Sequence, residues 1–233
     1  MPFQMALDEV LFNGHYESLQ KNPNCVLPIL RFFHSYESWV TVGYTHREEI
    51  PNPRRTCRRI TGGGRVVHGK DLMFSLVAQK SADVSFGSVR LSYWKIHEAV
   101  KYGLELAGVK PRFYRVDENL PRGFDCFTFP IATDLALGLN KVAGGSQKRS
   151  RGIFLHQESV RLIPGISSTE FQRGLCAGFQ KVFGVNLKPA PIFPSQLKEA
   201  QELSQKKYEI KQAVQFGYHS LTTENERVGN SIE

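Results

Sequence analysis

The chain has 233 residues, of which 41% are hydrophobic, and this length and composition suffice for one well-packed core. No change in composition divides it, so we expect a single domain over residues 1–233 with a polar tail from about residue 216. No apolar run approaches the roughly 18 to 20 residues of a membrane span, and the first residues do not resemble a secretion signal, which predicts a cytoplasmic protein.

The net charge of +8 favours acidic partners. Nucleic acid is a poor candidate, because the basic residues are scattered and their densest cluster, at 54–59, adjoins a glycine run and not an aromatic-rich face. The four cysteines have no metal-binding spacing and are not expected to form disulfides in a reducing compartment. We therefore predict no metal site and treat each cysteine as a small buried side chain or a reactive thiol; they are Cys25, Cys57, Cys126 and Cys176.

The first half of the chain predicts one helix and several strands. A helix is expected over residues 5–12, followed by a polar connector and two strands at 29–33 and 39–42. Two prolines, Pro51 and Pro53, interrupt the chain before the arginine cluster. A buried strand is expected at 73–78.

The second half predicts helices that pack on a sheet. Apolar residues recur at helical spacing over 89–107, and Ser167 with Glu170 forms a capping box that opens a second helix ending at Gly184. A third helix is expected after Ser195. Short strand-like runs at 113–116, 133–137, 141–145 and 152–162 are separated by tight turns, which indicates antiparallel pairing. The predicted fold is α/β (α+β), with a mixed, largely antiparallel sheet flanked by helices.

The most distinctive feature is the run Arg58-Arg59-Ile60-Thr61-Gly62-Gly63-Gly64-Arg65-Val66-Val67-His68. Three consecutive glycines allow positive φ and let backbone N–H groups approach a carbonyl or phosphate oxygen. The run lacks the Gly-Lys-Ser/Thr of a Walker loop and does not match a dinucleotide fingerprint. It therefore indicates a ligand-binding loop without identifying the ligand.

This run resembles the signature loop of lipoate protein ligases and octanoyltransferases. Three further parts of the chain are similar to motifs of that family and occur in the same order. Residues 5–9 resemble its opening helix, residues 30–32 with 39–44 resemble its first hairpin, and residues 140–149 resemble its lysine motif. Together they cover about residues 5–208. The resemblance implies the biotin/lipoate protein ligase (class II synthetase-like) fold and transfer of a lipoyl or octanoyl group to a lysine of a lipoyl domain.

The resemblance also implies roles for particular residues. Lys141 would place its ammonium at the reacting carbonyl and stabilise the oxyanion that develops there. The acyl group would be held by Arg58, Thr61, Gly62, Gly63, Gly64, Val66, His68, Gly144 and Ser146. The expected protein partners are the lipoyl domains of 2-oxoacid dehydrogenases or the glycine cleavage H protein, with an acyl carrier protein as a possible donor.

Cys126 separates two mechanisms. The segment Asp125-Cys126-Phe127 resembles the one that carries the nucleophile in the thioester branch of the family, and a nearby cation would increase the thiolate fraction. We therefore expect an acyl-Cys126 intermediate. The first alternative is an ATP-dependent ligase that forms lipoyl-AMP with ATP and Mg²⁺, which the three glycines favour. The second is a non-catalytic binding module, because residues 156–159 read His-Gln-Glu-Ser where the family pattern is Gln-His-Gly-Ser.

Overall fold

The computed structural model describes residues 1–22, 26–47, 55–115 and 131–208. Within these residues a six-stranded sheet has the order β1-β5-β9-β8-β7-β6, and every neighbouring pair is antiparallel. Its strands are β1 (Ile29–Phe33), β5 (Asp71–Gln79), β9 (Ile153–Arg161), β8 (Asn140–Ser150), β7 (Leu135–Leu137) and β6 (Arg112–Phe113). A smaller sheet has the order β3-β2-β4, with β3 at Thr56–Arg58, β2 at Val40–Val42 and β4 at Arg65–Val67.

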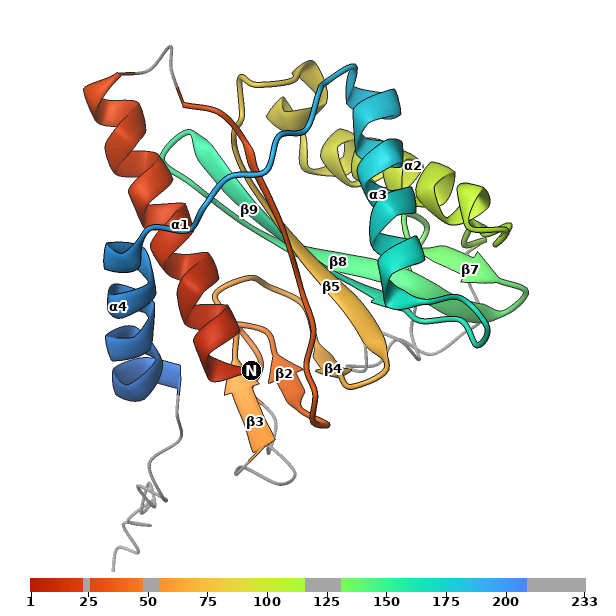
Figure 1. Ribbon diagram of the computed structural model, residues 1–233, viewed down its shortest axis with the longest axis horizontal. Helices are drawn as coiled ribbons and strands as arrows, with labels where there is room; N and C mark the ends of the chain where they lie inside the picture. The colour runs from red at the N-terminus through yellow and green to blue at the C-terminus, as the bar shows by residue number, and fades with distance from the viewer. Residues whose placement is uncertain (23–25, 48–54, 116–130, 209–233) are drawn as a thin grey trace, which may run out of the picture.

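Helices cover both faces of the large sheet (Figure 1). Because side chains alternate along a strand, Leu72 and Phe74 of β5 join the core beneath α2 (Val89–Leu106) and α3 (Ser168–Phe183). Their neighbour Met73 belongs to the opposite core, with α1 (Pro2–Lys21) and α4 (Pro194–Leu203). A 3₁₀ turn at Val84–Gly87 leads into α2, and a π turn at Ser204–Tyr208 follows α4. None of the described helices is long and apolar enough to cross a membrane.

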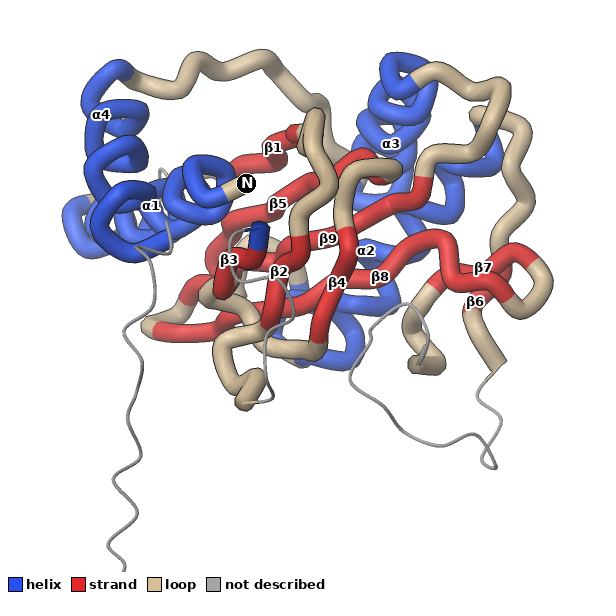
Figure 2. Tube along the Cα trace, turned by 90° about the horizontal axis from the view of Figure 1, so that it is seen from below, coloured by secondary structure: helices blue, strands red, loops and turns tan. Residues whose placement is uncertain are grey.

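The small sheet lies on the α1 side of the molecule. Both views place β2 and β3 close to the N-terminus of α1 (Figures 1 and 2). The turn after β3 is joined to β8 by a hydrogen bond from Gly62 N–H to the Gln147 carbonyl. This arrangement brings the glycine run against the middle of the large sheet.

Several predicted elements are confirmed. Strand β1 coincides with the predicted 29–33, and α2 with 89–107 to within one residue. The capping box of Ser167 and Glu170 opens α3, and Gly184 ends it with φ of +65°. The antiparallel pairing of the later strands is confirmed as well.

Two expectations are corrected. The first helix does not end at residue 12 but continues to Lys21, because Asn13 and Gly14 are tolerated where the helix surface faces solvent. The segments at 29–33 and 39–42 do not form a hairpin: β1 pairs with β5 in the large sheet, whereas β2 pairs with β3 and β4 in the small one. The predicted tail from about residue 216 lies outside the described residues.

Candidate active site

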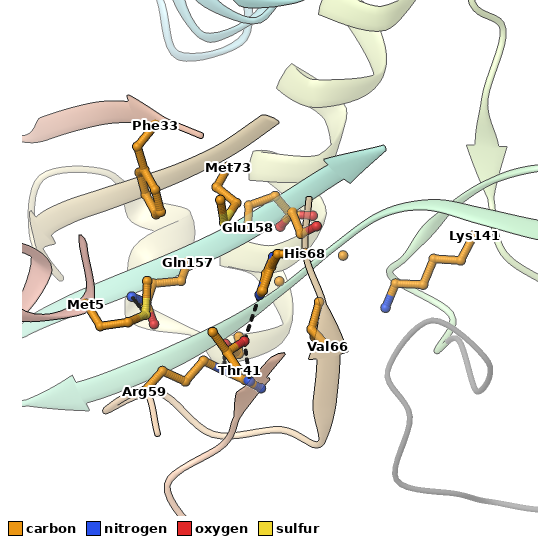
Figure 3. Close-up of a pocket in the computed structure, with 14 residues that line it drawn as sticks. Met5, Phe33, Thr41, Arg59, Val66, His68, Met73, Lys141, Gln157 and Glu158 are labelled. Carbon is orange, nitrogen blue, oxygen red and sulfur yellow. Dashed lines mark hydrogen bonds between the residues drawn. The ribbon is translucent and has the colours of Figure 1, made fainter. Parts of the chain in front are cut away.

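A pocket lies between the small sheet and the α1 side of the large sheet (Figure 3). Of the predicted acyl-binding residues, Val66, His68, Gly144 and Ser146 line it, whereas Arg58, Thr61 and the glycines at 62–64 do not. It takes side chains from both sheets and from α1, and its free volume is about 40 Å³. Apolar side chains form one part of its wall and polar groups the other. The lining residues are Met5, Phe33, Thr41, Arg59, Val66, His68, Met73, Lys141, Gly144, Gly145, Ser146, Gln157, Glu158 and Ser159.

Arg59 holds the glycine run in place. Its buried guanidinium donates from Nη2 to the carbonyls of Gly62 at 2.7 Å and Gly64 at 2.9 Å. The same group donates to Thr41 Oγ1 and Ser146 Oγ, both at 3.2 Å. Because a guanidinium presents several fixed donors, one side chain fixes both the loop and two hydroxyls of the pocket.

Arg58 does not share this role. Its Nη1 donates to the backbone carbonyls of Gly43 at 2.9 Å and His46 at 2.7 Å, on the turn that follows β2. This turn after β2 packs closely on the glycine run, since a Cβ at Gly43 would overlap the carbonyl oxygen of Gly63. Gly63 itself has φ of +84°, a conformation that favours glycine. The structure thus places Arg59, and not Arg58, among the residues that line the pocket.

A buried polar chain joins the glycine run to α1. Ser146 donates to Thr61 Oγ1 at 2.8 Å, and Thr61 donates to Gln157 Oε1 at 2.7 Å. Gln157 then donates from Nε2 to Asp8 Oδ2 at 2.7 Å, and Asp8 pairs with Arg31 at 2.6 Å. Thr61 and Ser146 are therefore hydrogen-bonded to each other, and Thr61 orients Ser146 and Gln157, which line the pocket.

Lys141 enters the pocket from β8 (Figure 3). Its Nζ lies 2.7 Å from Asp134 Oδ2, and the two side chains are only 5% and 2% exposed. Burial raises the pKa of Asp134, although Lys141 and the N–H of Ile131 act to lower it. Gly144 makes room for this pair, because a Cβ there would overlap Lys141 Nζ. A desolvated ammonium is thus held at a defined place beside the pocket.

His68 lies on the pocket wall between a hydroxyl and a carboxylate. Its Nε2 is 2.8 Å from Thr41 Oγ1, and its Nδ1 is 2.6 Å from Asp71 Oδ2. Burial acts to raise the pKa of Asp71, but hydrogen bonds from His68, Ser159 and the Gly69 N–H outweigh it and hold that pKa below its usual value. Asp71 is therefore an ionised, fully hydrogen-bonded carboxylate.

A second titratable cluster lies on the α2 side of the sheet. Glu158 Oε2 is 2.7 Å from His156 Nε2 and 3.0 Å from His97 Nε2, and all three side chains are fully buried. Burial opposes the charge of Glu158, but the two histidines outweigh it and lower the pKa of Glu158 to about 2. Burial also opposes the charge of His97, yet Glu158 raises the pKa of His97, whereas burial lowers the pKa of His156. The cluster is thus an ion pair of Glu158 and His97 with a neutral His156.

These three side chains bring potential metal ligands within 4.8 Å of one another. Their hydrogen bonds, however, place protons on the histidine nitrogens that face Glu158, and a metal ion would need lone pairs on those nitrogens. Gln147 Oε1 accepts from Arg149 at 2.8 Å, so its amide Nε2 donates to His156 Nδ1 at 3.1 Å. The proton of neutral His156 then lies on Nε2, facing Glu158. The geometry supports a structural ion pair better than a metal site.

The described cysteines are poor nucleophiles. Cys57 is buried, and burial raises its pKa to about 12. Cys176 lies half-buried on α3, and burial raises its pKa as well. Cys126, the proposed nucleophile, lies outside the described residues, as does Cys25. The acyl-Cys126 intermediate therefore stays a prediction.

Sequence reasoning missed several residues that the fold brings to the pocket. Asp71 follows His68 by three residues and could have been found from that spacing. Asp134 precedes the lysine motif but gave no signal of its ion pair. Thr41 and Met5 reach the pocket only through long-range packing, and no local pattern marks them.

Comparisons with known proteins identify the family of the chain. The model of the lipoyl protein ligase A/B catalytic domain matches residues 1–215. Octanoyltransferase LipM of Bacillus anthracis is 28% identical over 262 aligned positions, which cover 90% of this chain and 92% of that protein.

Solved structures share the fold. Lipoate-protein ligase A bound with ATP superposes with a TM-score of 0.72 at 21% identity, covering 90% of this chain and 92% of that one. A bi-partite lipoate protein ligase from Thermoplasma acidophilum, studied with its E2 lipoyl domain, gives a TM-score of 0.67 at 21% identity, with coverage of 90% and 89%. From the match over nearly its whole length, the chain belongs to the lipoyl protein ligase A/B catalytic domain family.

Proposed function

We propose that this protein transfers an octanoyl or lipoyl group to the lysine of a lipoyl domain. The observation that carries the proposal is the buried Lys141 ammonium beside a partly apolar pocket. Next to the acyl carbonyl, this cation would stabilise the oxyanion of the transition state in a site that excludes water. The similarity to an octanoyltransferase supports the same reaction.

The pocket must widen to accept the acyl chain. Its free volume of about 40 Å³ is smaller than an octanoyl group. Met5 and Met73 line it, and methionine side chains are unbranched and adapt readily to a new neighbour. We infer that these two side chains move when the chain binds, while the polar groups around Arg59 stay fixed.

Cys126 is the proposed nucleophile of a two-step transfer. The acyl group would pass from the donor to Cys126 as a thioester and then to the acceptor lysine. The donor would be an acyl carrier protein or another lipoylated protein, and acceptors would be lipoyl domains of 2-oxoacid dehydrogenases or the glycine cleavage H protein. The net charge of +8 favours such partners where they are acidic.

The alternative is an ATP-dependent ligase, in which Lys141 and the glycine run bind an acyl-adenylate and Cys126 has no role. The shared fold does not separate the two, since one structural relative contains ATP. A third hypothesis is a non-catalytic binding module, because residues 156–159 depart from the family pattern.

One experiment separates these possibilities. Apo lipoyl domain is mixed with octanoyl carrier protein alone, or with free lipoate and ATP, and the acceptor is weighed by mass spectrometry. The transferase predicts labelling without ATP and an octanoyl adduct on the enzyme that Cys126→Ala abolishes and Cys176→Ala retains. Labelling only with ATP would favour the ligase, and no labelling in any mixture would favour the binding module.

A further inference from the structure

Thr41, His68 and Asp71 form a continuous hydrogen-bonded chain at the pocket (Figure 3 shows the first two). Thr41 comes from β2, His68 follows β4, and Asp71 begins β5. All three are buried, and Thr41 and His68 line the pocket. A hydroxyl, an imidazole and a carboxylate in this order resemble the arrangement by which a base is oriented to take a proton.

The neighbours of the chain fix the direction of its protons. Arg59 can only donate, so its bond to Thr41 Oγ1 leaves the Thr41 hydroxyl proton to point at His68 Nε2. Asp71 is ionised and accepts from His68 Nδ1. Ser159 donates to the same carboxylate oxygen at 2.6 Å. His68 Nε2 therefore faces the Thr41 hydroxyl with its lone pair.

The proposed reaction needs such a base. A lysine side chain has a pKa of about 10.4 in water, so the acceptor amine arrives protonated and must lose a proton before it attacks. Lys141 is unsuited to accept it, because its ammonium is engaged in the ion pair with Asp134. Among the described residues that line the pocket, His68 is the imidazole in reach of a substrate.

We propose that His68, oriented by Asp71 and reached through the Thr41 hydroxyl, is the general base that deprotonates the acceptor lysine. This inference rests on the proposed acyl transfer. Thr41 would relay the proton, and Asp71 would act as a positioning residue that keeps the lone pair of His68 on Nε2.

The acceptor nitrogen loses a proton before it attacks. Thr41 Oγ1 receives one proton from the acceptor ammonium as its own proton passes to His68 Nε2, which leaves a neutral amine. The amine attacks the acyl carbon of the thioester, so a C–N bond forms and the C–S bond breaks. Sulfur leaves with the bonding electron pair and takes the second proton from nitrogen, and His68 releases its proton to solvent.

Charged groups face His68 from each element that packs around it. Asp71 of β5 presents a negative charge, whereas Arg59 after β3 and Lys141 of β8 present positive charges. Glu158 of β9 also lines the pocket, but it is neutralised by His97. The surroundings of His68 therefore carry charges of both signs.

The test compares three variants with two acceptors. Asp71→Asn favours the wrong tautomer of His68, Thr41→Val removes the relay hydroxyl with little change of shape, and Thr41→Ser keeps it. Octanoyl transfer to the apo lipoyl domain is measured from pH 6.5 to pH 10. We expect Asp71→Asn and Thr41→Val to lose about 10²- to 10⁴-fold in rate at pH 7, with Thr41→Ser recovering most of the loss.

The pH profile separates a base from a structural role. Without the base, the rate should rise about tenfold per pH unit as solvent deprotonates the acceptor, so that variants approach the unaltered protein near the lysine pKa of about 10.4. Transfer to hydroxylamine, which is largely unprotonated at neutral pH, should fall far less than transfer to the lipoyl domain.

Any of three results would overturn the inference. A loss of equal size at every pH, or equal losses with both acceptors, would mean that the chain only supports the pocket; no loss in Thr41→Val would remove the relay. If Asp71→Asn does not fold, the comparison of Thr41→Val with Thr41→Ser still tests the inference. If the unaltered protein acylates neither the lipoyl domain nor hydroxylamine from octanoyl carrier protein, it is the proposed function that fails, and the relay with it.

Discussion

Gly144 lies directly against the ammonium of Lys141. A Cβ at this position would overlap Lys141 Nζ and would lie 2.8 Å from Asp134 Oδ1. The absence of a side chain at residue 144 is therefore what allows the buried ion pair to form beside the pocket. The lysine and its glycine act as one unit, although they lie three residues apart on β8.

Gly144→Ala should therefore abolish most acyl transfer. The new methyl group would push Lys141 away from its place beside the pocket, and the loss of oxyanion stabilisation should cost about 10²- to 10³-fold in kcat. Gly87→Ala is the matched control, because a Cβ at Gly87 meets no atom within 4 Å and its backbone needs no positive φ. Steady-state rates of lipoyl-domain acylation measure both, and unchanged kcat in Gly144→Ala would contradict the placement of Lys141.

Arg59→Lys should impair the site more than Arg58→Lys. A lysine cannot reproduce the fork that holds the carbonyls of Gly62 and Gly64 together with Thr41, so the glycine run should lose its fixed shape. With about 1.5 to 3 kcal/mol per charged hydrogen bond, a fall in kcat/KM of about 10- to 100-fold is expected. Arg58 contacts only the turn after β2, so its variant should fall by a smaller factor. A larger fall in kcat/KM for Arg58→Lys than for Arg59→Lys would show that Arg58 contacts the substrate, as predicted from the sequence.

Local sequence patterns sufficed for elements whose signal is complete within a few residues. The spacing of apolar residues predicted α2, and the pair Ser167 and Glu170 marked the start of α3. The glycine run was predicted to be a ligand-binding loop because arginines precede it and His68 follows it, and its contact with a ligand stays a prediction. These features depend on the backbone preferences of single residues and on residues close in sequence, and both can be judged from the sequence.

Long-range relationships were beyond such patterns. Thr41 meets His68 across 27 residues, and Ser146 meets Arg59 across 87. The expected hairpin of residues 29–42 was wrong, because β1 pairs with β5 in the large sheet and β2 pairs with β3 and β4 in the small one. The choice between Arg58 and Arg59 likewise depended on the fold, because Arg58 contacts the turn after β2, whereas Arg59 contacts Gly62 and Ser146.

Glu158→Gln should destabilise the fold at neutral pH. Removing one partner of a fully buried ion pair costs about 3 to 5 kcal/mol, because the remaining His97 is left without its counter-charge. Glu105→Gln is the control, since Glu105 pairs with Lys101 on the exposed surface of α2, and it should change the free energy of unfolding by less than about 0.5 kcal/mol. Urea denaturation at pH 7 measures both.

The same variant should remove part of the acid sensitivity. The pKa of Glu158 is about 2 in the folded protein against 4.5 for an ordinary glutamate, so this carboxylate contributes stability that is present above pH 4.5 and is lost as the pH falls towards 2. The contribution is about 3 kcal/mol. The unfolding free energies of the unaltered protein and Glu158→Gln should converge over this interval, and a constant difference between them would contradict the low pKa.

Glycines also set the distance between α2 and α3, and a pair of alanine substitutions tests this. A Cβ at Gly178 would overlap the carbonyl oxygen of Ala99, so Gly178→Ala must separate the helices and should cost about 1 to 3 kcal/mol of stability. Gly14 lies inside α1, and a Cβ there meets no atom within 4 Å. Gly14→Ala should therefore stabilise the protein by about 0.5 to 1 kcal/mol, because alanine favours the helix over the unfolded chain. Urea unfolding of both variants gives opposite signs if the packing of the two helices is as close as the structure shows, whereas a stabilising Gly178→Ala would mean that α2 and α3 lie farther apart.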